Sequence, residues 1–185
     1  QGMKISRIDL ADIGSPRRLA SQIHAIEDLP PAVPIHELCA ALDIHSIKEI
    51  GTKAFEGALI TNELRSVGHI LVNQHSPRRR QRFSIAHELG HFLIEAHTPG
   101  PGGRIECTLQ DLHLLDPRSR DRRLRMEAEA NLFAAELLMP PKKIRLEIGR
   151  LGVSLQSLTE IAQTFDVSKE AMGRAFVAAH RDPVA

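Results

Sequence analysis

The pentad His87-Glu88-Leu89-Gly90-His91 constrains this chain most, because it lies inside the run Phe83 to Ala96, which has helical spacing throughout. Apolar side chains recur at the intervals of one helix face, namely Ile85, Leu89, Phe92 and Ala96. This spacing predicts a helix with one face buried in a core. The remaining face carries two histidines and a glutamate, and polar groups on a largely buried helix need partners.

Histidines four residues apart stand one above the other on a helix, so His87 and His91 can bind one Zn²⁺ together. Glu88 faces the same site, where it can take a proton from the attacking water as the general base of a metallopeptidase. The alternative is an ordinary helix that carries two core or surface histidines.

A second helix is expected at Met126 to Met139, an alanine- and leucine-rich run that ends at Pro140 and Pro141. Zinc sites with an open position commonly use two histidines and one glutamate, so this helix is expected to supply the third ligand. Glu127 and Glu129 are about 200° apart on a helix and cannot both face the metal. We assign Glu127 as the ligand and Asn131, one turn further, as the support of a ligand histidine. Glu129 shares a stripe with Glu136 that is expected to be solvated.

The segments RFSIAHELGHFL and EAEANLFAAELLMP together resemble the two signature helices of the ImmA/IrrE metallopeptidases. The resemblance covers about residues 33 to 174. It implies zinc at His87, His91 and Glu127, Glu88 as general base, and a strand pair at 58–61 and 68–73 before the zinc helix. Mn²⁺ or Fe²⁺ would also suit these ligands. The segment from Pro99 to Arg125 is longer than the family needs.

The family's substrate is typically an Xre-type helix-turn-helix repressor, cut so that repression is relieved under stress or during induction of a mobile element. Many members carry their own N-terminal DNA-binding domain, and this chain shows none. The resemblance therefore implies a separately encoded repressor or antitoxin as partner.

The expected fold class is α+β, with a zincin-like core, a small antiparallel sheet and a C-terminal helical subdomain. Extended segments are predicted at 44–50, 55–60 and 67–73. Residues 1–2 are predicted to be a scar of tag cleavage, and residues 3–32 a helical arm with a proline-rich linker. Residues 33–141 are the predicted peptidase core, and residues 142–185 are the predicted helical subdomain.

Composition excludes several classes of protein. The 24 Lys and Arg residues against 23 Asp and Glu give a formal net charge of +1, so no global field favours nucleic acid or an anionic membrane. The lack of a long apolar run or signal-peptide pattern leads us to expect a cytoplasmic protein.

The two cysteines, Cys39 and Cys107, show no paired spacing. Cys107 is expected to be a packed cysteine, with a zinc-capping or oxidant-sensing thiolate as the alternative.

The C-terminal run from Ser154 to Ala179 resembles a helix-turn-helix unit, with Ser154 and Ser168 as helix caps. Its second helix offers chiefly Lys169 and Arg174 to a nucleic acid, which favours a bracing role over DNA binding. The arginine clusters at 78–82 and 118–125 are either paired with acidic residues or form a basic rim that steers a substrate.

Two functions of different classes follow. One is a site-specific metalloprotease, and the other is a non-catalytic binding module that regulates a transcription factor or DNA. A structural zinc would have four protein ligands and would not need Glu88 between the histidines, which favours the protease. His69 and His75 are both candidates for the residue that stabilises the oxyanion, and the sequence does not decide between them.

Overall fold

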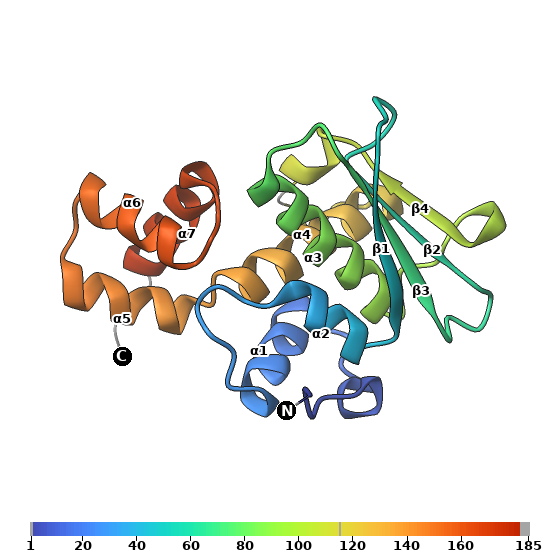
Figure 1. The fold of residues 1–185 in the computed structure, drawn as a ribbon, viewed down its shortest axis with the longest axis horizontal. Coiled ribbons are helices and arrows are strands. Elements are labelled where there is room, and N and C mark those ends of the chain that lie inside the picture. The colour runs from blue at the N-terminus through green and yellow to red at the C-terminus, as the bar shows by residue number, and fades with distance from the viewer. Residues whose placement is uncertain (1, 115, 182–185) are drawn as a thin grey trace.

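The computed structural model describes residues 2–114 and 116–181 as seven α-helices, three 3₁₀ turns and four strands (Figure 1). Gln1 of the predicted scar, Leu115 and residues 182–185 of the predicted helical subdomain lie outside the described residues. The α-helices are α1 (Pro16–Ile26), α2 (Ile35–Ala41), α3 (Arg78–Leu93), α4 (Arg122–Leu138), α5 (Pro141–Leu151), α6 (Leu155–Thr164) and α7 (Lys169–Arg181). The strands are β1 (Ile44–Ile50), β2 (Gly57–Thr61), β3 (Gly68–Asn73) and β4 (Arg104–Cys107), and the 3₁₀ turns are η1 (Arg7–Leu10), η2 (Pro101–Gly103) and η3 (Asp111–His113).

The four strands form one sheet in the order β1-β3-β2-β4. The α+β class and the small sheet are confirmed, but the sheet is mixed and not wholly antiparallel, because β1 pairs with β3 in parallel. Only the pairs β2–β3 and β2–β4 are antiparallel. The connection from β1 to β2 leaves the position next to β1 empty. Residues 62–67 then return the chain into that position as β3, so β3 runs in the same direction as β1. Strand β4 was not predicted from the sequence.

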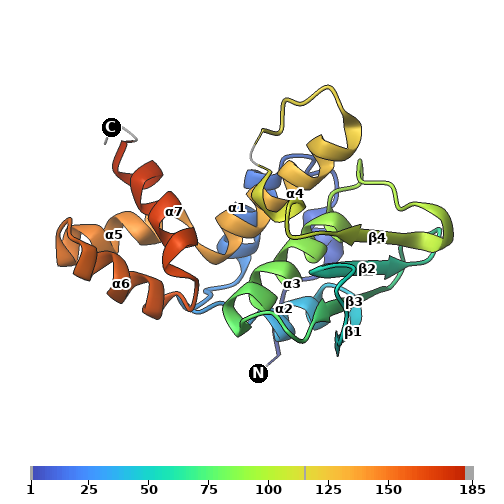
Figure 2. The same ribbon diagram turned by 90° about the horizontal axis from the view of Figure 1, so that it is seen from above.

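Helix α3 lies at the centre of the molecule, between the sheet and α4 (Figure 2). Every residue from Ser84 to Phe92 is buried, as a helix packed on two sides requires. Gly90 permits the close approach of α4, since a Cβ atom there would lie 2.9 Å from Cδ1 of Phe133. The N-terminal arm joins the same core, because α1 packs on α4 and buries Leu19 and Ile23 completely.

The last three helices, α5 to α7, form a helical unit beside the core (Figure 1). Ile161, Phe165 and Met172 are fully buried between them. Both expected caps are present: Ser154 Oγ accepts a hydrogen bond from Ser157 N at 2.9 Å, and Ser168 Oγ accepts one from Ala171 N at 3.1 Å. None of the helices in the described part of the chain combines the length and the apolarity needed to cross a membrane.

Candidate metal centre

The contact between α3 and α4 brings His87, His91 and Glu127 together. The Nε2 atoms of the two histidines are 3.0 Å apart, and Glu127 Oε2 lies 3.1 Å from Nε2 of His87 and 3.4 Å from Nε2 of His91. Both histidines are fully buried and Glu127 is nearly so. Two imidazoles and a carboxylate that converge on one point could hold a metal ion, and this is the donor set that catalytic zinc sites commonly use.

Asn131 fixes the tautomer of His87. The Nδ2 group of Asn131 donates to the carbonyl oxygens of Asp111 at 2.7 Å and Leu114 at 2.9 Å, so its Oδ1 atom must face His87 Nδ1, 2.8 Å away. An amide oxygen only accepts, so His87 Nδ1 carries the proton. In the neutral ring the Nε2 lone pair of His87 is left for a metal ion, and the residues present fit a divalent metal. Against the lowering effect of burial, Glu127 and Glu88 raise the pKa of His87, so metal binding would displace a proton from this ring.

The same ligand atoms explain the pKa values of the site. Burial by itself raises the pKa of Glu127, but hydrogen bonds with His87 and His91 outweigh it and hold that pKa far below its ordinary value. Burial lowers the pKa of His91 to about 3, although Glu127 acts in the opposite direction. Thus a neutral His91 and an ionised Glu127 are the stable forms, and these are the forms that bind a metal.

Glu88 lies beside the ligands with its carboxyl group fully buried. Its Oε1 atom accepts a hydrogen bond from Sγ of Cys107 at 2.9 Å, and its Oε2 atom has no hydrogen-bond partner among the described residues. Burial raises the pKa of Glu88 to about 7, against the opposing effects of His87 and Cys107. A carboxylate of this basicity, with one oxygen free, suits a group that takes up and releases a proton near neutral pH.

Cys107 is a packed cysteine at the end of β4. Burial, followed by the negative charge of Glu88, raises the pKa of its thiol well above the ordinary value. Metal binding and oxidation both require the thiolate, so this environment works against the alternative of a zinc-capping or oxidant-sensing Cys107. The backbone of β2 also approaches here, since a Cβ atom on Gly57 would lie 2.7 Å from Glu88 Oε1.

One residue of this cluster was missed from the sequence. His97, in the loop after α3, is fully buried, with Nδ1 2.9 Å from Nδ1 of His91 and Nε2 2.9 Å from Oε2 of Glu129. Burial lowers the pKa of His97, with Glu129 opposing it. Glu129 therefore pairs with a core histidine, and its expected place on a solvated stripe is wrong. His97 lies six residues after His91, outside the helical repeat, and the sequence gives no direct signal for this contact.

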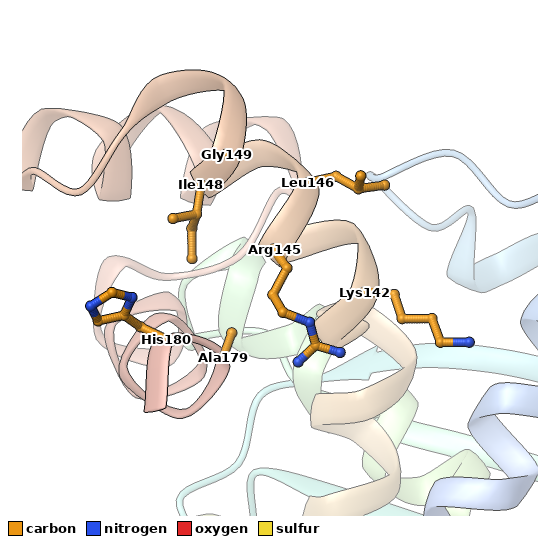
Figure 3. Close-up of a pocket in the computed structure, with 7 residues that line it drawn as sticks. All are labelled: Lys142, Arg145, Leu146, Ile148, Gly149, Ala179 and His180. Atoms are coloured by element: carbon orange, nitrogen blue, oxygen red, sulfur yellow. The ribbon is translucent and has the colours of Figure 1, made fainter. Parts of the chain in front are cut away.

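Other candidates lie apart from the cluster. His69, on β3, has its Nδ1 atom 2.9 Å from Oγ of Ser46 on β1, and β1 is the edge strand opposite to β4. A groove of about 580 Å³ between α5 and α7 is lined by none of the proposed ligand residues (Figure 3). Its polar lining consists of basic side chains and one histidine, namely Lys142, Arg145 and His180. Among the described residues, the groups that could hold a metal ion lie where α3 meets α4 and the end of β4.

Residues 39–176 match the family model described as the IrrE N-terminal-like domain, Peptidase_M78. The chain is 36% identical over 100 residues to the radiation response metalloprotease IrrE of Deinococcus deserti, a match that covers 54% of this chain and 32% of that protein. It is 30% identical over 107 residues to the protein of the same name from Deinococcus radiodurans, covering 54% of this chain and 27% of the relative. The matched stretches thus span about a third or less of these relatives. Since the family model covers most of the chain and includes both signature helices, the chain belongs to the ImmA/IrrE family of metallopeptidases.

Proposed function

We propose that this protein is a zinc-dependent endopeptidase that cleaves a partner protein, with His87, His91 and Glu127 as metal ligands. The observation that carries the proposal is the combination of three convergent ligand atoms with the buried carboxyl group of Glu88 beside them. A structural zinc site would close its fourth position with another protein ligand. Cys107 could occupy that position by distance, but its thiol is engaged with Glu88 and held in the protonated form.

A metal held by His87, His91 and Glu127 would polarise the scissile carbonyl group and lower the pKa of a water molecule toward about 7. Glu88 accepts the proton of the attacking water and then passes it to the departing amine. Cys107 holds one oxygen of Glu88, which leaves Oε2 as the atom that accepts and releases this proton. Asn131 holds the ring of His87 in the metal-binding tautomer through the transfer.

The proposed substrate is an Xre-type helix-turn-helix repressor or antitoxin, whose cleavage relieves repression during stress or induction of a mobile element. This part rests on membership of the family and on the two relatives, which are named radiation response metalloproteases. Such a repressor acts in the cytoplasm, and we propose the same location for this protein. Zinc is the proposed metal because catalytic zinc sites commonly use two histidines and one glutamate. Mn²⁺ and Fe²⁺ would also accept these ligands.

The test compares the wild type with Glu88→Gln, which keeps the shape of the side chain and removes the base. Metal content is measured by elemental analysis, and each protein is incubated with the Xre-type repressor encoded nearest to it. We expect one zinc per chain in both proteins and cleavage by the wild type alone. Zinc in both without cleavage would favour the non-catalytic binding module, and a folded wild type without metal would refute the metalloprotease.

A further inference from the structure

We propose that His97 and Glu129 form a relay behind His91 that positions this ligand and strengthens its bond to the metal. The inference rests on the metal site of the proposed function and extends it to two residues outside the ligand set. His97 comes from the loop after α3 and Glu129 from α4, so the relay ties together the segments that flank the site.

The relay is a continuous chain of side-chain contacts. His91 Nδ1 lies 2.9 Å from His97 Nδ1, and His97 Nε2 lies 2.9 Å from Glu129 Oε2. Both imidazoles are fully buried, whereas 23% of the Glu129 side chain is exposed. The carboxylate at the outer end is therefore hydrated in part, which reduces the cost of its charge, and the inner end reaches the metal position.

Proton counting gives the direction of each hydrogen bond. When Nε2 of His91 binds a metal, the proton of its neutral ring is on Nδ1, which donates to His97 Nδ1. His97 Nδ1 is then an acceptor, so the proton of His97 is on Nε2 and is donated to Glu129. Each nitrogen and oxygen of the chain has one role, and the negative charge of Glu129 makes His91 a stronger electron donor to the metal.

Arg65 fixes the backbone on which the relay depends. Its guanidinium group donates to the carbonyl oxygens of His91 and His97, the latter at 2.8 Å, and also to the chain between them. The loop that carries His97 is thus fastened to the last turn of α3. The two ligand histidines differ in support as a result: His87 is held by the neutral amide of Asn131, and His91 by a relay that ends in a carboxylate.

The test measures zinc affinity, by competition with a chromophoric chelator, for His97→Phe and Glu129→Gln. His97→Phe keeps a ring and removes both hydrogen bonds, so we expect zinc to bind about 10- to 100-fold more weakly. Glu129→Gln keeps an acceptor and removes the charge, so a smaller loss is expected. Glu136→Gln is the matched control, because Glu136 lies two turns further along α4, is about as exposed as Glu129, and pairs with Arg17 instead of a histidine. The zinc affinity of Glu136→Gln should equal that of the wild type.

Two further measurements separate positioning from folding. The melting temperature of each metal-free variant shows whether the fold persists, and Glu129→Gln keeps the test decisive should His97→Phe fail to fold. Long-range ¹H–¹⁵N spectra of the zinc-loaded wild type should show a proton on His91 Nδ1 and on His97 Nε2. Wild-type zinc affinity in Glu129→Gln and a folded His97→Phe, or a proton on His97 Nδ1, would overturn the relay.

The outcome for the relay is distinguishable from the outcome for the proposed function. Weakened zinc binding in the variants supports the relay even where no repressor is cut, in which case only the protease proposal fails. A folded wild type that binds no zinc overturns both.

Discussion

Glu127 and Glu129 are separated by one residue on α4, yet they face different histidines. Glu127 Oε2 contacts Nε2 of both His87 and His91, whereas Glu129 Oε2 contacts Nε2 of His97. We expect Glu127→Ala to abolish stoichiometric zinc binding, because a ligand is lost, and Glu129→Ala to weaken it by only about 10- to 100-fold. Elemental analysis after dialysis against a weak chelator distinguishes the two. Retention of zinc by Glu127→Ala together with its loss from Glu129→Ala would reverse the assignment.

The buried carboxyl group of Glu88 predicts a pH-dependent stability of the metal-free protein. Burial raises its pKa from 4.5 to about 7, so the folded state holds this proton more tightly than the unfolded state. The Glu88 contribution to stability is greatest below pH 4.5 and is lost as pH rises to about 7. Glutamine at position 88 does not titrate. The free energy of unfolding of metal-free Glu88→Gln, relative to that of the wild type, should therefore be higher at pH 8 than at pH 5, by an amount on the order of 3 kcal/mol.

Urea denaturation of wild type and Glu88→Gln at the two pH values measures this difference. Glu56→Gln serves as control, since Glu56 is only partly buried and accepts a hydrogen bond from Ser76 Oγ. A gain for Glu88→Gln that is equal at pH 5 and pH 8 would contradict a raised pKa of Glu88.

At the same scale, the sequence predicts the parts of the site that follow the helical repeat. The spacing of His87 and His91, and of Glu127 and Asn131, places each pair on one helix face, and the structure brings these faces together. His97 and Cys107 reach the site from a loop and from an edge strand. No periodicity links such positions to α3, because their contacts depend on the tertiary path of the chain.

At the scale of elements, the packing of α3 on α4 depends on Gly90. An added methyl group at Gly90 would lie 2.9 Å from Cδ1 of Phe133 and 3.4 Å from Cα of Ala130. We expect Gly90→Ala to destabilise the protein by about 1–3 kcal/mol, because the two helices would have to separate. Separation would also move His87 and His91 away from Glu127, so zinc affinity should fall with stability.

The matched control for this prediction is Gly149→Ala on α5. No atom lies within 4 Å of a Cβ atom at Gly149, so the substitution adds helix propensity and should stabilise the protein by about 0.5–1 kcal/mol. Thermal and urea unfolding of both variants measures the contrast. A neutral Gly90→Ala with wild-type zinc affinity would show that the interface of α3 and α4 adapts freely.

The strands show where element prediction stops. The sequence pattern indicates extended segments at 44–50, 55–60 and 67–73, close to the observed β1, β2 and β3. It does not specify which strands pair, because the burial pattern of a strand is the same for a parallel and an antiparallel neighbour. Strand β4 has only four residues after a Pro/Gly loop, so its assignment comes from its pairing with β2.

At the scale of the whole molecule, one acidic residue in the turn between α6 and α7 forms ion pairs between the helical unit and the core. Asp166 Oδ1 lies 2.5 Å from Arg78 Nη2 and 3.3 Å from Arg79 Nε, and Arg82 Nε forms an ion pair with Oδ2 at 3.2 Å without hydrogen-bond alignment. Three arginines of the cluster at 78–82 are therefore paired within the chain. This arrangement favours structural pairing over a basic rim for that cluster, and a bracing role for α6 and α7.

Asp166→Asn tests this junction. Asp166 has φ +54°, a conformation that asparagine also adopts, so the substitution removes the charge without adding backbone strain. Because the Arg82 side chain is only 12% exposed, it would be left partly buried without its partner. We expect a loss of stability of about 1–3 kcal/mol, above the value of a surface pair and below that of a fully buried one.

Glu170→Gln is the control, since its pair with Arg174 is exposed and should be worth less than about 0.5 kcal/mol. Hydrogen exchange should show the largest loss of protection in α6, α7 and the first turn of α3. Equal stability of the two variants would mean that apolar packing alone holds the helical unit on the core.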